Sequence, residues 1–207
     1  MEQIVISIGR QFGSGGRIIG KALAEKLNID YYDNELLVLA AKQNGLAPEF
    51  FESNDEISNS LFGFASNILD NIGLGTFTNN MLSGDTLFQM QSETIKKLAS
   101  EKSCIIVGRC SDYILRDYEY CMSVFYWAPI DDRIHRVSQR LGTDDRDKVR
   151  QLIEREDSRR AKYYNYFTGK TWGAASSYDA CLNVALLGVD ATAELTIELL
   201  QKRFRKK

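Results

Sequence analysis

The sequence has little histidine, little proline and no closely paired cysteines. Its 207 residues contain one histidine, His135, and four cysteines, none of them in a C-x-x-C pair. This composition lacks the ligand pairs of a structural zinc site, and it predicts reduced, mostly buried thiols. The two prolines, Pro48 and Pro129, are too few to predict a rigid linker between domains.

Two further absences limit the expected partners. The 26 basic residues do not outnumber the 28 acidic ones, which leaves a net charge of −2. Nucleic-acid and membrane-surface binders are usually strongly basic, so we expect neither partner, whereas a small anionic ligand needs only a local basic pocket. No apolar run approaches the about 20 residues of a membrane-spanning helix. The start, MEQIVISIGR, lacks a signal-like segment, so we expect a cytoplasmic protein.

Hydrophobic patterning predicts alternating strands and helices. Short apolar runs predict five strands, at residues 4–8, 30–33, 104–107, 123–127 and 180–187. Helical spacing predicts helices at residues 18–27, 34–44, 87–102, 130–141, 145–166 and 191–205. Such alternation is typical of a parallel sheet with helices on both faces, so the predicted fold is a three-layer α/β/α domain with a five-stranded parallel sheet.

The whole chain, residues 1–207, is long enough for one domain with an insertion. We expect a core made of residues 1–44, 87–129 and 175–207. Residues 45–86 are rich in Asn, Ser, Phe and Gly and predict a helical insertion. Residues 130–174 predict a lid that continues into a long helix.

A glycine-rich segment, residues 9–17, follows the first predicted strand and precedes the first predicted helix. Glycines allow successive backbone N–H groups to point at one anion, and the helix adds the positive end of its dipole. A strand before and a helix after are the context of a phosphate-binding loop. A glycine-rich turn that only packs closely against the core is the alternative.

The segment departs from the G-x-x-x-x-G-K-[ST] motif at its charged positions. With Gly15 as the last motif glycine, Gly16 stands at the lysine position, Arg17 at the Ser/Thr position and Arg10 at the first glycine. The missing lysine charge must then come from elsewhere, and Arg17 is the nearest candidate, with Lys21 one helical turn further on. The predicted phosphate-binding residues are Arg10, Gly13, Ser14, Gly15, Gly16, Arg17 and Lys21.

Polar residues also follow other predicted strands. Asp33 ends the second strand and Arg109 follows the third. Because ligands of open parallel sheets bind beyond the carboxyl ends of the strands, both are candidate ligand contacts, and Arg109 can bind a phosphate through two hydrogen bonds. Alternatively, Asp33 caps the next helix and Arg109 is a surface residue.

Arginine is concentrated late in the chain, where eight arginines lie between Arg133 and Arg160 among nearly as many acids. One interpretation is a pair of solvated helices with i,i+4 ion pairs. The other is a lid, because phosphoryl transfer needs cations around the migrating group. On that interpretation Arg133 and Arg136 join Arg17 as catalytic candidates. The aromatic residues at 163–178 could line a base pocket or pack in the core.

Three stretches together resemble a known family, and the likeness spans nearly the whole chain. They are the opening I-S-I-G-R-Q-F-G-S-G-G-R at 6–17, I-V-G-R-C at 106–110, and Tyr163-Tyr164 with Tyr178-Asp179 and Asn183. These residues resemble the cytidylate kinase-like family. The resemblance implies a P-loop nucleoside-monophosphate kinase fold that transfers the γ-phosphate of ATP to CMP, dCMP or a related small acceptor, with ATP and Mg²⁺. Since Gly16 replaces the lysine, a nucleotide-binding regulatory protein without catalysis is the alternative.

The resemblance also implies roles for particular residues. Asp33 and Arg109 match residues that hold the acceptor, and Asp157 and Arg160 resemble the acid and arginine that hold cytosine and phosphate. Arg133 and Arg136 lie where lid arginines are expected. The implied partner is a small nucleotide, the segment 45–86 is the expected place of acceptor binding, and a homodimer is left open. The chain departs from cytidylate kinases at Gly16 and at Asn34-Glu35, where Asp33 is usually followed by Thr-Gly.

Overall fold

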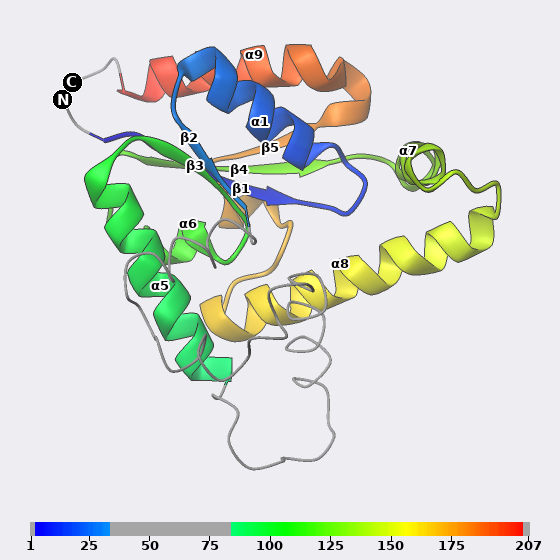
Figure 1. Cartoon of the computed structure of the whole chain (residues 1–207), viewed down its shortest axis with the longest axis horizontal. Coiled ribbons are helices and arrows are strands. Elements are labelled where there is room, and N and C mark those ends of the chain that lie inside the picture. Colours follow the sequence, from blue (N-terminus) through cyan, green and yellow to red (C-terminus); the bar gives the residue numbers. More distant parts are fainter. Residues whose placement is uncertain (1–2, 34–83, 205–207) are drawn as a thin grey trace, which may run out of the picture.

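The computed structural model describes residues 3–33 and 84–204 (Figure 1). The predicted helix at 34–44 and nearly all of the predicted insertion lie outside the described residues. The five strands are β1 (Val5–Arg10), β2 (Asp30–Tyr32), β3 (Cys104–Val107), β4 (Cys121–Trp127) and β5 (Ala180–Asn183). They form one five-stranded sheet in the order β2-β3-β1-β4-β5, and every neighbouring pair is parallel. The predicted parallel sheet is confirmed.

Helices cover both faces of the sheet. Helices α1 (Gly16–Leu27) and α9 (Val184–Phe204) pack on one face, and α5 (Gly84–Glu101), α6 (Ser111–Ile114) and α8 (Arg146–Thr168) lie on the other (Figure 1). Helix α7 (Ile130–Leu141) follows β4 and packs against α8. A short 3₁₀ turn, Ala175–Ser177, precedes β5. This is the predicted three-layer α/β/α architecture.

Alternation along the central strands explains the two cores. On β3, Cys104 and Ile106 pack into the cluster that includes α5 and α8, while Ile105 and Val107 pack into the cluster of α1 and α9. Successive side chains of a strand point to opposite faces, so a fully apolar strand feeds both cores. All four β3 side chains are at most 1% exposed.

A third cluster ties the glycine-rich loop to α7 and α8. Ile134 and Val137 of α7 pack with Val149 and Ile153 of α8, and Phe12 of the loop packs against them. The loop is therefore held from two sides, by the sheet that precedes it and by the α7–α8 pair.

The prediction for the last strand was wrong over its second half. Strand β5 ends at Asn183, and Val184 to Leu187 form the first turn of α9. The partner strand β4 ends opposite Asn183, so no ladder continues, and the Asn183 side-chain oxygen accepts a hydrogen bond from Ala185 N at 3.1 Å. A short apolar run has no period that separates a strand from a helix, and Leu186 is in fact 79% exposed. The short helix α6 was not predicted.

Candidate active site

The glycine-rich loop has the backbone of an anion-binding turn. Gly13 and Gly15 have φ of 78° and 97°, in the left-handed region that favours glycine. A Cβ on Gly13 would lie 2.7 Å from Val137 Cγ2, so the residue also needs to be small. Helix α1 begins at Gly16, and the first N–H groups of a helix have no acceptor within it. These donors and the helix dipole face the loop, which fits a bound phosphate.

Side chains from α7 and α8 hold the loop in place. Asp157 accepts a hydrogen bond from Phe12 N at 2.7 Å through one oxygen and from Arg133 at 2.5 Å through the other. Arg133, 8% exposed, also donates to Phe12 O at 3.4 Å. Arg136 donates to Gly13 O at 2.6 Å. Three predicted functional residues therefore bind the loop backbone from α7 and α8 and hold its shape: Arg133, Arg136 and Asp157.

Two other predicted phosphate-binding residues, Ser14 and Lys21, do not line the cavity described next. The buried Ser14 hydroxyl donates to Gln11 O at 3.0 Å, within the turn. Lys21 is exposed on α1. Their roles in phosphate binding stay predictions.

Arg17 and Asp33 form an ion pair between the start of α1 and the end of β2. Asp33 is 6% exposed, whereas half of the Arg17 side chain is accessible. The pair brings the predicted acceptor-binding acid to the same edge of the sheet as the loop. It also neutralises much of the charge that Arg17 would offer to a phosphate.

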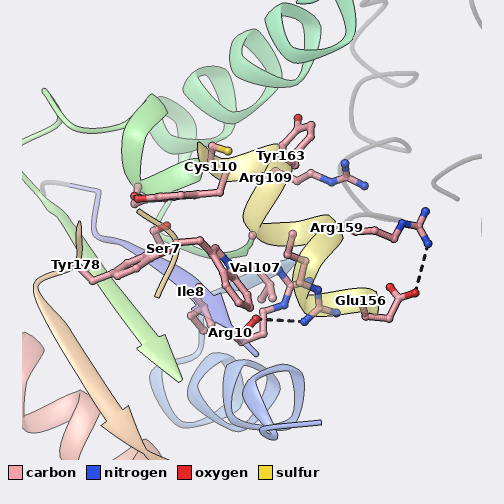
Figure 2. Close-up of a pocket in the computed structure, with 16 residues that line it drawn as sticks. Ser7, Ile8, Arg10, Val107, Arg109, Cys110, Glu156, Arg159, Tyr163 and Tyr178 are labelled. Carbon is pink, nitrogen blue, oxygen red and sulfur yellow. Dashed lines mark hydrogen bonds and ion pairs between the residues drawn. The ribbon is translucent and has the colours of Figure 1, made fainter. Parts of the chain in front are cut away.

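A cavity of about 190 Å³ opens at the carboxyl ends of β1 and β3, against α8 (Figure 2). Arg10, Arg109 and Arg160 line it. Gly108, Arg109 and Cys110 all have positive φ, between 55° and 81°. This backbone costs about 1–3 kcal/mol for each residue other than glycine, and such strain is concentrated at functional sites. The turn carries Arg109 from the end of β3 to the cavity wall.

Four arginines line the cavity, and three of them, Arg10, Arg109 and Arg160, have no carboxylate at ion-pair distance among the described residues. Arg160 donates to the carbonyl oxygen of Arg10 at 3.2 Å, and Arg109 lies over the Tyr163 ring at 5.9 Å. Burial lowers the pKa of Arg10, and the positive charges of Arg160, Arg109 and Arg17 lower it further. Burial also lowers the pKa of Arg160. Asp157 and Glu156 act in the opposite direction on the pKa of Arg160, but neither forms an ion pair with it. Clustered guanidinium groups without an ion pair are costly to bury, and an anion in the cavity would offset that cost.

Aromatic residues and one acid form the rest of the wall. The Tyr164 hydroxyl donates to Asp112 at 2.7 Å, and the Tyr164 and Tyr178 rings stack with centroids 5.8 Å apart. Burial raises the pKa of Asp112. Burial likewise raises the pKa of Tyr163 to about 12. The three tyrosines pack in or against the core, as one interpretation of the aromatic stretch predicted, and they also line the cavity. Their role as a base pocket stays a prediction.

Sequence reasoning missed several residues of this site. Asp112 lines the cavity beside the predicted arginines. Glu156 and Arg159, which form an ion pair at 3.3 Å, line it too (Figure 2). Asp112 follows the Gly108-Arg109 pair within three residues in the sequence, which was the available signal. The buried Ser7 and Ser111 hydroxyls bond at 2.6 Å and join β1 to α6.

The described residues offer little to a metal ion. Within residues 3–33 and 84–204, no group of three or more His, Cys, Asp or Glu is arranged to hold one. Arg17 stands where the P-loop motif has the hydroxyl that binds Mg²⁺, so the loop itself does not fit that ion. In the same part of the chain, no helix is long and apolar enough to cross a membrane.

Solved structures share this architecture. An uncharacterized protein from Eubacterium ventriosum is 28% identical, with 96% of this chain and 99% of that chain covered and a TM-score of 0.72. Shikimate kinase from Bacteroides thetaiotaomicron is 16% identical over 96% of each chain, with a TM-score of 0.52. Shikimate kinase from Acinetobacter baumannii, in complex with shikimate, is 13% identical over 100% and 97%, with a TM-score of 0.50. At such identities the two kinases show the fold alone.

Sequence comparisons complete the assignment. No curated protein sequence gives a significant match. The model of the cytidylate kinase-like family matches residues 5–186, which include the glycine-rich loop, the Gly108-Arg109 turn and all five strands. With its kinase-like P-loop fold and this match over most of its length, the chain belongs to the cytidylate kinase-like family.

Proposed function

We propose that the protein is a kinase that transfers the γ-phosphoryl group of ATP to CMP, dCMP or a related small anionic acceptor. The observation that carries the proposal is the convergence of Arg10, Arg109 and Arg160 on one cavity beside the glycine-rich loop, with no carboxylate partner in the described part of the chain. Phosphoryl transfer requires chiefly positioning and positive charge, which is what this arrangement supplies.

In this proposal the ATP phosphates bind the backbone N–H groups of the loop, from Gly13 to the start of α1. The nearest side-chain atoms to a Cβ on Gly15 would be Val184 Cγ1 at 3.6 Å and Arg136 Nη1 at 3.7 Å. The nucleoside part of ATP then extends toward the β5–α9 corner, where the exposed Leu186 offers apolar surface. Magnesium arrives with the nucleotide, bound mainly by phosphate oxygens and water.

The acceptor occupies the cavity. Arg109 and Arg160 bind its anionic group, and the aromatic wall with Asp112 contacts its ring or hydroxyl groups. Asp157, the residue expected to hold cytosine, already accepts hydrogen bonds through both oxygens. Recognition of cytosine by Asp157 would need this contact to open, so acceptors other than CMP belong in the test.

The test is a coupled assay of ADP release with ATP and a panel of acceptors: CMP, dCMP, the other nucleoside monophosphates and shikimate. We expect acceptor-dependent turnover with one class of acceptor. Arg109→Gln should lower kcat/KM by about 10²-fold or more, since a charge-assisted phosphate contact is removed. Arg150→Gln is the matched control. Arg150 forms an ion pair with Asp131 at 3.8 Å and does not line the cavity. Absence of acceptor-dependent turnover across the panel would contradict a kinase function.

A regulatory nucleotide-binding protein is the second candidate, favoured by Gly16 in place of the lysine. It predicts ATP-induced thermal stabilisation, by mass action, without turnover. Any measurable acceptor-dependent phosphoryl transfer would exclude it. Loss of that transfer in Arg17→Ala would show that Arg17 fills the lysine's role, and unchanged transfer would show that another cation does.

A further inference from the structure

Two positions of the loop have exchanged residue types relative to the P-loop motif. Arg10 stands where the motif has its first glycine, and Gly16 stands where it has the lysine. A long cation has replaced a residue without a side chain, and a residue without a side chain has replaced a long cation. The sequence alone does not say whether the two changes are related.

The structure shows that the two positions share one space. A Cβ on Gly16 would lie 2.7 Å from Cβ of Arg10 and 3.1 Å from its Cγ. Real Cβ atoms essentially never approach another heavy atom below 3.0 Å. A lysine at position 16 is therefore incompatible with Arg10 in its observed place, and the stem of Arg10 fills the room next to the start of α1.

The Arg10 side chain ends in the cavity rather than in solvent. It lines the cavity wall with Arg109, and a Cβ on Gly108 would collide with its Nη1 atom (Figure 2). Its Nε atom is buried and has no hydrogen-bond partner among the described residues. No ion pair to Arg10 exists in that part of the chain, although Arg133 and Arg17 both have one.

We propose that Arg10 is a catalytic residue that supplies the positive charge of the missing P-loop lysine, and that Gly16 provides the space it needs. This inference rests on the proposed kinase function. In the transfer step the bond from the β–γ bridging oxygen to γ-phosphorus breaks and its electron pair stays on ADP. The acceptor oxygen bonds to phosphorus and its proton passes to solvent. Arg10 forms no covalent bond and stabilises the negative charge on the transferred group.

The charge environment supports this placement. Arg10 lies between the loop, which precedes α1, and the turn after β3, which carries the acceptor-side Arg109. Repulsion from Arg160, Arg109 and Arg17 acts on Arg10 in addition to its burial. A phosphoryl group next to Arg10 would offset this repulsion by attraction, because each equatorial oxygen carries negative charge in the transition state.

The test compares four variants in the acceptor-dependent assay: Arg10→Gln, Arg10→Lys, Gly16→Lys and the double variant Arg10→Gly with Gly16→Lys. We expect Arg10→Gln to lower kcat by about 10²-fold, as loss of one stabilising donor does in other enzymes. Arg10→Lys should retain more activity than Arg10→Gln. Gly16→Lys alone should lose activity because its side chain collides with that of Arg10. The double variant lacks the Arg10 side chain, and its activity should be at least tenfold higher than that of Gly16→Lys alone.

Arg116→Gln is the matched control, because Arg116 is an exposed arginine that stacks on Tyr113. Circular dichroism and thermal melts verify the fold of each variant, and comparison of Arg10→Gln with Arg10→Lys suffices if the double variant does not fold. Activity of Arg10→Gln within threefold of the parent would overturn the proposal. So would equal losses in Arg10→Gln and Arg10→Lys.

A separate measurement distinguishes this inference from the kinase function itself. If the parent shows no turnover with any acceptor, the proposed kinase function fails. The role of Arg10 is then decided by the thermal shift with ATP and with tripolyphosphate. A shift that Arg10→Gln greatly reduces, and Arg10→Lys largely retains, supports a phosphate contact at Arg10, whereas a shift unchanged in Arg10→Gln overturns it.

Discussion

At the scale of single residues, the same side chain has different roles according to its nearest neighbours. Of the arginines in α7 and α8, Arg133 pairs with Asp157, and Arg146 and Arg150 both pair with Asp131. These contacts run between the two helices, so the expected ladder of i,i+4 pairs is not what holds this region. Arg160, by contrast, faces the cavity, and within residues 3–33 and 84–204 its one hydrogen-bond acceptor is the carbonyl oxygen of Arg10. It retains its charge for a ligand.

The Arg133–Asp157 pair gives the first residue-scale prediction. Asp157→Asn should destabilise the protein by about 3–5 kcal/mol, because it leaves a buried guanidinium without its partner charge. The two side chains are 9% and 15% exposed, so solvent screens the pair little. Urea unfolding measures the loss.

Asp131→Asn is the control for that prediction. Its pair with Arg146 has side chains 71% and 60% exposed, and an exposed pair contributes about 0–1 kcal/mol. If Asp157 acts only on the acceptor, Asp157→Asn would instead leave the unfolding free energy unchanged and raise KM for the acceptor.

At the scale of elements, the turn after β3 links the cavity to the sheet. Its residues from Gly108 to Cys110 adopt positive φ, and α6 starts directly after them. Helix α6 is joined to α8 by the bond from Tyr164 to Asp112, and to β1 by the bond between Ser7 and Ser111. The turn is thereby fixed on both sides, which explains how Arg109 keeps its strained conformation.

Asp112 makes the stability of this junction depend on pH. Burial raises the pKa of Asp112 in the folded protein above the ordinary value of an unfolded chain. Between the ordinary pKa and the raised pKa of the folded protein, the unfolded state has lost this proton while the folded state still binds it. The free energy of unfolding therefore falls as pH rises through that range. Asp112→Asn removes the titration and should abolish that fall while its amide oxygen still accepts from Tyr164. Urea unfolding of both proteins from about pH 3 to pH 7 measures it.

Asp30 supplies a control of opposite sign for this pH dependence. The hydrogen bond from Lys102 lowers the pKa of Asp30, so its contribution is present above the ordinary value and is lost as pH falls. Asp30→Asn should therefore reduce the loss of stability on acidification. A parallel response of the Asp112 and Asp30 variants would contradict the burial of Asp112.

At the scale of the whole molecule, the sheet separates two apolar cores of similar extent. One gathers residues of α5, α6 and α8, and the other residues of α1 and α9. Strand β1 lies at the centre, paired with β3 and β4, and contributes to both. Because every central strand feeds both faces, we expect the two cores to unfold together.

Adjacent residues of β3 test that cooperativity. Ile105 and Ile106 are both 0% exposed and belong to opposite cores. Ile105→Ala and Ile106→Ala should each cost about 2–5 kcal/mol, with a single urea transition and the same slope as the parent. Leu186→Ala, at a position 79% exposed, should change stability by less than about 0.5 kcal/mol. Two separate transitions in either core variant would show that the faces unfold independently.

Much of this architecture was predictable because its signals are local. The apolar runs of β1 and β3 and the spacing of α7 follow from short windows of sequence, and the family motifs located the loop and Arg109. The second half of β5 was predicted wrongly because the end of its partner strand decides where pairing stops. The contact of Asp157 with Arg133 was not predicted, because it joins two helices whose packing only the folded chain sets.

The sequence by itself determined the layered fold, the position of the glycine-rich loop and the absence of a lysine at position 16, since each depends on residues adjacent in the chain. Only the tertiary structure decided which arginines have a partner charge. Arg133 meets Asp157, and Arg10 meets Gly16, Gly108 and Arg160. Electrostatic energies depend on distance in space and on exclusion of water, and both are set when strands and helices from distant parts of the chain pack together.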